Sequence, residues 1–127
     1  MNIRLINAPD APAPLANYTQ AVEVTSPSRI LYISGQIPVG TDGAVPSNFG
    51  EQCRLAWANI EAQLRAADMT PDNLVKITVF LADRRFALES REVRRAILGD
   101  RRPAATVIIT GIFDAAWLVE IEAVAAA

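Results

Sequence analysis

The sequence contains no histidine, and its single cysteine is Cys53. Without histidine the chain cannot form a Ser-His-Asp triad, use an imidazole as a general base, or bind zinc through imidazole. One cysteine excludes an internal disulfide and a cysteine cluster for a metal, and a lone thiol is typical of the reducing cytoplasm. Any catalysis must therefore rest on carboxylates, hydroxyls, amides or guanidinium groups, and we expect neither a metal nor a cofactor.

Long apolar runs and an excess of positive charge are also missing. No stretch of about 18 uncharged apolar residues occurs, and the N-terminus lacks the apolar core of a signal peptide. The chain has 12 Lys and Arg against 14 Asp and Glu, so its net charge is −2. This balance favours neither nucleic acid nor an anionic membrane as a partner. We therefore expect a cytoplasmic protein that binds neither.

The 127 residues are 51% apolar, which suits one domain over residues 1–127 with a core of its own. Alternating and helical periodicities predict the order strands, helix, strand, helix, strands. The expected strands cover residues 3–6, 21–24, 30–34, 74–81, 103–109 and 117–124, and the expected helices cover residues 49–67 and 86–98.

Two finer expectations follow from this pattern. Residues 21–24 and 30–34 should form a hairpin around the turn at Ser26-Pro27-Ser28. The order of elements predicts an α+β fold in which two helices pack on one face of a sheet. Leu74 and Phe80 would lie on the other face, so we expect that face to meet another subunit.

A polar corner follows the strand 30–34, where the sequence reads Ser34-Gly35-Gln36-Ile37-Pro38. Gly35 permits backbone angles that other residues avoid, and Pro38 cannot donate to a sheet. A hydroxyl and an amide are thus displayed where we expect the strand to end. By composition alone, an ordinary turn explains the segment better than a binding site does.

Glu120 and Glu122 alternate with apolar residues in the last strand. Period-two alternation places both carboxylates on one face, and a shielded glutamate is an adequate general base in a chain without histidine. A solvated, charged strand face is the simpler interpretation of this pair. The same holds for Arg101 and Arg102, which could clamp an anion but also suit a surface turn. Cys53 and the neighbouring tryptophan are expected to be core residues.

Taken together, these segments resemble the RidA/YjgF family of small trimeric proteins. The most specific match is Ser34-Gly35-Gln36-Ile37-Pro38 after an apolar strand. Further matches are residues 17–21 (NYTQA), 74–81 (LVKITVFL), 103–104 (PA) and 119–123 (VEIEA), in family order and at near-family spacing over almost the whole chain.

The resemblance implies a chorismate-mutase-like fold and a homotrimer in which three sheets form a barrel-like core with the helices outside. It places a cleft for a small-molecule metabolite between neighbouring subunits, and many members hydrolyse reactive enamines and imines there. In that cleft Glu120 would be the catalytic residue that activates water. The implied ligand-binding positions are Tyr18, Ser34, Gly35, Arg91, Ala105 and Thr106.

Two of these positions depart from the family pattern. Ala105 stands where deaminating members carry an arginine that holds the substrate carboxylate, and Arg91 stands where the family often has asparagine. Standard deamination of 2-iminobutanoate or 2-iminopropanoate is therefore disfavoured, because a bidentate arginine contact is lost. Two hypotheses stay open: a hydrolase with an altered cleft, or a non-catalytic metabolite-binding trimer. A ribonuclease, a label that some members carry, is disfavoured by the acidic balance and the missing histidine.

Overall fold

The structure is a computed structural model that describes residues 1–127. It contains two α-helices, two short 3-10 helices and six strands. The helices are α1 (Phe49–Ala66) and α2 (Ala87–Leu98), and the 3-10 turns are η1 (Pro71–Asn73) and η2 (Arg84–Phe86). The strands are β1 (Asn2–Ile6), β2 (Ala21–Thr25), β3 (Ile30–Gln36), β4 (Leu74–Leu81), β5 (Ala104–Ile109) and β6 (Val119–Ala126).

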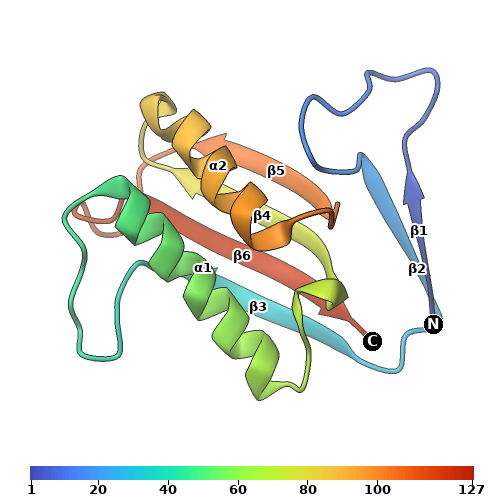
Figure 1. The fold of residues 1–127 in the computed structure, drawn as a ribbon, viewed down its shortest axis with the longest axis horizontal. Coiled ribbons are helices and arrows are strands. Elements are labelled where there is room, and N and C mark those ends of the chain that lie inside the picture. Colours follow the sequence, from blue (N-terminus) through green and yellow to red (C-terminus); the bar gives the residue numbers. More distant parts are fainter.

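Four of the strands form the main sheet, in the order β3-β6-β4-β5. β6 is antiparallel to both of its neighbours, whereas β5 runs parallel to β4. The parallel pair needs a crossover, and α2 provides it. Both helices cover the same face of this sheet, while β1 and β2 form a separate arm beside it (Figure 1). The predicted α+β fold with two helices on one sheet face is confirmed.

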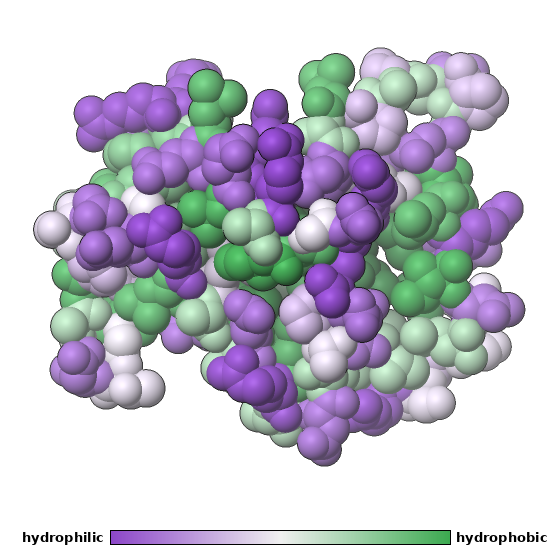
Figure 2. Space-filling model, in the orientation of Figure 1, coloured by the Kyte–Doolittle hydropathy of each residue, from purple (hydrophilic) through white to green (hydrophobic).

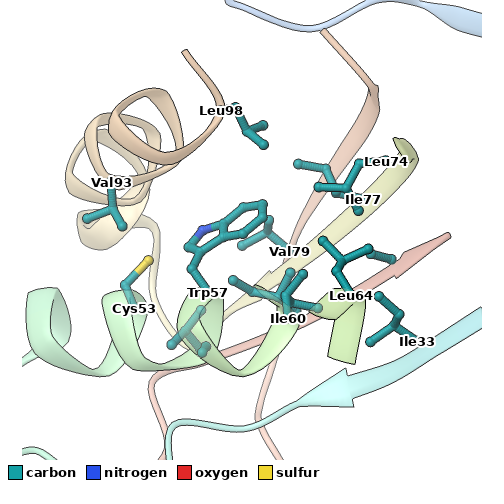
Figure 3. Close-up of a cluster of buried hydrophobic side chains, with 14 of the residues drawn as sticks. Ile33, Cys53, Trp57, Ile60, Leu64, Leu74, Ile77, Val79, Val93 and Leu98 are labelled. Carbon is teal, nitrogen blue, oxygen red and sulfur yellow. The ribbon is translucent and has the colours of Figure 1, made fainter. Parts of the chain in front are cut away.

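The core lies between the helices and the sheet. Its largest side chain is Trp57 of α1, which points between α2 and the strands (Figure 3). Ile77 and Val79 of β4 and Leu98 of α2 complete the buried contacts around it. Because α1 presents residues at three- and four-residue spacings, one stripe of the helix is fully buried. As expected, Cys53 belongs to this stripe.

The ends of both helices match their sequence signals. The side chain of Asn48 accepts a hydrogen bond from the backbone N–H of Glu51 at 2.9 Å, which caps the first turn of α1. Asp68, just after α1, has a φ of 55°, so the chain leaves the helix through a left-handed residue. Gly99 ends α2 with a φ of 58°, as predicted.

The predicted hairpin of residues 21–24 with 30–34 is wrong. β2 pairs with β1 instead, with Asn2 opposite Thr25 and Ile6 opposite Ala21. The turn contains Ser26 in a left-handed conformation, with a φ of 52°, and the chain then turns toward the C-terminus. The backbone N–H groups of residues 28 and 29 both donate to the carbonyl of Ala127. β3 therefore pairs with β6 rather than with β2.

Two local expectations also need correction. The pairing of β4 with β6 shifts between Leu74 and Lys76, and this irregularity turns Leu74 into the core instead of the opposite face. The polar corner is not a strand end, because β3 continues to Gln36. Its register with β6 shifts between Ile33 and Gln36, so Ser34 and Gly35 occupy a bulge inside the strand.

Hydrophilic residues dominate the face that the helices present, with small hydrophobic areas between them (Figure 2). Several large apolar side chains are nevertheless exposed elsewhere, among them Tyr32 on the uncovered face of the main sheet. Neither α1 nor α2 combines the length and the hydropathy that crossing a bilayer requires.

Candidate functional site

Glu120 lies on β6 with its side chain on the sheet face that the helices leave uncovered, opposite Phe80 of β4. Its carboxylate lies directly against Gly35 in the bulge of β3. A Cβ atom placed on Gly35 would be 2.8 Å from the carboxyl carbon of Glu120 and 3.1 Å from its Cγ. Only glycine leaves room for this contact, so the structure brings together two residues that the sequence singled out separately.

A cavity of about 230 Å³ adjoins this carboxylate. Glu120 is half-buried, and its side-chain carboxylate forms no hydrogen bond with another group of the chain. Its oxygens are therefore free to accept hydrogen bonds from water or from a ligand. We name this region the Glu120 half-site; it consists of Gly35, Phe80, Thr110, Gly111, Ile112, Phe113 and Glu120.

A second cavity, of about 210 Å³, lies on the helix side of β5. It brings together Tyr18, Arg91 and Ala105, three of the predicted ligand-binding residues. Tyr18 reaches this place because the next residue, Thr19, is buried and donates its backbone N–H to the carbonyl of Pro103 at 3.3 Å. We name this region the Tyr18 half-site; it is lined by Leu15, Ala16, Tyr18, Arg91, Arg94, Ala105 and Val107.

Arg94 is the residue of this cavity that the sequence interpretation missed. It is only 5% exposed, and its Nε atom is buried without a hydrogen-bond partner. Burial lowers the pKa of its guanidinium, and the positive charge of Arg91 lowers it further. The signal was present in the helical period, since Ser90, Val93 and Leu98 place Arg94 on the buried stripe of α2. The neighbouring Arg95 instead pairs with a glutamate at the surface.

Ser34 and Thr106 belong to neither half-site. Ser34 lines a cavity of about 390 Å³ on the uncovered sheet face, together with Lys76 and Glu122. Thr106 accepts a hydrogen bond from Nζ of Lys76 at 2.6 Å. Burial lowers the pKa of Lys76, and the charge of Glu122 opposes that shift. Because successive strand residues alternate between faces, Ala105 and Thr106 point to opposite sides of the sheet.

The remaining candidates, Arg101, Arg102 and Cys53, lie in neither half-site. Nε of Arg101 forms an ion pair with Oδ1 of Asp72 at 2.6 Å, and its Nη1 donates to the carbonyl of Leu98. Arg102 is exposed at the side of the arm. Burial raises the pKa of the Cys53 thiol to about 11, so almost no thiolate forms near neutral pH.

The two half-sites lie on opposite faces of the main sheet: Glu120 and Phe80 lie on the uncovered face, whereas the Tyr18 half-site lies on the helix side of β5. Gly35 belongs to β3 and Ala105 belongs to β5, and these are the two outermost strands. Each half-site also exposes a large apolar side chain: Leu15 is 88% exposed and Phe113 is 96% exposed. One copy of the chain therefore presents the two half-sites as separate, open groups, with Ser34 and Thr106 outside both.

Comparisons with known proteins found relatives that cover most of this chain. The family model described as endoribonuclease L-PSP matches residues 8–127. A RutC family protein of Pyrococcus horikoshii is 32% identical over 91% of each chain. The 2-iminobutanoate/2-iminopropanoate deaminase of mouse is 32% identical over 96% of this chain and 90% of its own.

Solved structures show the same fold. The Rid family protein YyfB of Yersinia pestis, whose function is described as unknown, has a TM-score of 0.84 at 25% identity, with both chains fully covered. E. coli TdcF, solved with bound serine, has a TM-score of 0.75 at 26% identity over 98% of each chain. The chain therefore belongs to the RidA/YjgF family, whose members are also described as endoribonuclease L-PSP proteins.

Proposed function

We propose that this protein is a hydrolase of small imines or enamines, and that its active site forms between neighbouring copies of a homotrimer. The half-buried carboxylate of Glu120, held against Gly35 and free of hydrogen bonds within the chain, is the observation that carries the proposal. A carboxylate in this state can act as a general base toward water in a chain that has no histidine.

The separation of the half-sites supports the homotrimer. If the β3 edge of one copy faces the β5 edge of the next, Gly35 and the Glu120 carboxylate of one copy approach the Tyr18 half-site of its neighbour, and the two half-sites share one cleft. The same contact covers Leu15 and Phe113, whose exposure is otherwise unfavourable in water. Repeating the contact around a three-fold axis closes the assembly and leaves no open sheet edge.

The chemistry needs only water and the side chains of this cleft. Glu120 takes a proton from water while the oxygen attacks the carbon of the C=N bond, which gives a carbinolamine. In this carbinolamine the proton taken by Glu120 has passed to nitrogen. Glu120 then transfers the hydroxyl proton to the nitrogen, the C–N bond breaks, and ammonia leaves as the carbonyl forms. The similarity to the mouse deaminase supports this reaction class. Tyr18 would orient the ligand from the opposite wall of the cleft.

The test is ammonia release from 2-iminobutanoate generated in situ and from a panel of other imines. Glu120→Gln should lower the rate by roughly 100-fold or more, the contribution of a positioned general base. Glu122→Gln is the matched control, because it removes the same charge from the same face of β6. Equal rates for the wild type and Glu120→Gln would refute the catalytic role.

A second function, ligand binding without turnover, is favoured by one observation. Ala105 lines the Tyr18 half-site but has no polar side chain to hold a substrate there. Thermal-shift screening of keto acids and related metabolites separates the two functions, since a stabilising ligand that is never consumed supports binding alone. Deaminase activity that appears only in Ala105→Arg would show that the cleft has diverged from the standard reaction.

A further inference from the structure

Two arginines of α2, Arg91 and Arg94, both line the cavity of the Tyr18 half-site. They are three residues apart on the helix, so their Cβ atoms lie roughly 5–6 Å from each other. Neither side chain forms an ion pair, although Arg4, Arg95 and Arg101 each do so with an acidic side chain. Two unneutralised positive charges therefore face the same cavity.

Arg94 is the more unusual of the two, because a buried guanidinium without a partner is unfavourable. Its Nε is buried and donates to nothing within the chain. Burying a charge costs free energy unless an opposite charge or good acceptors compensate for it. The side-chain amide of Asn17, next to Tyr18, is also buried with both its oxygen and its nitrogen unpaired. Several polar atoms in this region thus lack partners in the single chain.

The size of the cavity indicates what kind of partner fits. Its 210 Å³ greatly exceeds the roughly 15 Å³ that one water molecule needs. Ala105 contributes to this room, since a longer side chain at that position would project into the space before Arg91 and Arg94. Val107 and Leu15 contribute apolar side chains to the rest of the wall, so an anion inside would take its hydrogen bonds chiefly from the two arginines.

We propose that Arg91 and Arg94 form an anion subsite that selects ligands with a compact dianionic group, a phosphoryl group being the model case. Two guanidinium groups neutralise two negative charges, whereas a single carboxylate would leave one positive charge uncompensated. Guanidinium groups also donate in a planar fork that matches the oxygens of a phosphoryl group. The inference rests on the proposed function only in taking this cavity as part of the ligand cleft.

The experiment is isothermal titration calorimetry with inorganic phosphate and with acetate, at low salt and about pH 8, above the second pKa of a phosphoryl group. The wild type should bind phosphate in clear preference to acetate. Arg94→Gln and Arg91→Gln should each weaken phosphate binding by roughly tenfold or more, because each removes a charge-assisted contact.

Arg95→Gln is the control for charge, since Arg95 lies on the same helix but pairs with Glu92 at the surface. Phosphate affinity that is unchanged in Arg94→Gln and Arg91→Gln, or no preference over acetate, would overturn the proposal.

A second measurement separates ligand binding from a structural role. In the absence of anions, Arg94→Met should unfold at the same temperature as the wild type or at a higher one, because it removes an uncompensated charge. If Arg94 instead pairs with an acidic group of a neighbouring copy, Arg94→Met will unfold at a lower temperature and the oligomer will dissociate more readily. A lower unfolding temperature together with easier dissociation would contradict the anion subsite, even if Arg94→Met also fails to bind phosphate.

The catalytic proposal and the anion subsite can fail separately. Glu120→Gln should lose turnover yet still bind phosphate in clear preference to acetate, because the two arginines that carry the subsite belong to the Tyr18 half-site. A protein that binds phosphate but hydrolyses no imine contradicts the catalytic proposal alone. A protein that hydrolyses imines with an unchanged KM in Arg94→Gln contradicts the subsite alone.

Discussion

Replacing Gly35 by alanine tests the central contact of the Glu120 half-site with a single methyl group. The new Cβ would lie 2.8 Å from the carboxyl carbon of Glu120, closer than unbonded carbon atoms approach. Since Gly35 does not have a positive φ, alanine can adopt its backbone conformation. The overlap therefore falls on the mobile end of the glutamate, which must rotate away from β3.

The expected effects on stability and on activity differ strongly. Moving Glu120 off its preferred rotamer costs about 0.5–1.5 kcal/mol, while a Gly→Ala change at a compatible position stabilises by about 0.4–1 kcal/mol. The free energy of unfolding should therefore change by no more than about 1 kcal/mol. The carboxylate, however, leaves its position, so Gly35→Ala should lose most of the roughly 100-fold to 10,000-fold contribution of a general base.

The assay combines urea unfolding with ammonia release for four proteins: the wild type, each single variant and the double variant Gly35→Ala/Glu120→Gln. If the methyl group acts only by displacing the carboxylate, the double variant will be no slower than Glu120→Gln alone. Full activity in Gly35→Ala would refute the reasoning, as would rate losses that multiply in the double variant. A destabilisation above about 3 kcal/mol would show that the backbone moves instead of the side chain.

Three further predictions concern the core. Gln52→Ala should destabilise the protein by about 3 kcal/mol in urea unfolding, because its buried amide bonds three backbone groups at 2.8–2.9 Å that would lose their partner. Replacing Trp57 by phenylalanine should cost less than about 1.5 kcal/mol, because the loss of core volume is offset by removing an indole N–H that is buried without a partner, and a larger loss would contradict that. In the folded protein, burial raises the pKa of the Cys53 thiol from its ordinary value of 9.0 to about 11. Between pH 9 and pH 11 the folded state therefore binds more protons than the unfolded state, so the free energy of unfolding should fall as the pH rises. Over this pH range the wild type should lose close to about 3 kcal/mol of unfolding free energy that Cys53→Ala does not lose. The same pH dependence in both proteins would refute the prediction.

Local signals predicted much of the fold. Asn48 and Gly99 indicated where the helices begin or end, and both act as caps in the structure. The alternation in β4 correctly placed Ile77 and Val79 in the core. Such signals work because capping and the two periodicities depend on neighbours in the sequence. Strand partners do not, and the pairing of β2 with β1 was therefore missed.

The candidate site was predicted less completely, for a related reason. The sequence identified Glu120 and Gly35, but their contact depends on a bulge in β3 that places the glycine against the carboxylate. Arg94 was missed because adjacent arginines look alike in a sequence. Only the packing of α2 on the sheet shows that one is buried while Arg95 is exposed.

The separation of Glu120 and Tyr18 into two half-sites has a genetic consequence. If neighbouring copies complete each cleft as proposed, Glu120→Gln and Tyr18→Phe damage different walls of the same cleft. In a trimer that mixes the two variants, a cleft contains no defect when its Glu120 wall comes from the Tyr18→Phe copy and its Tyr18 wall comes from the Glu120→Gln copy. With equal amounts and random assembly, about a quarter of the clefts would be intact. Two inactive alleles of this protein could thus restore activity to each other within one cell.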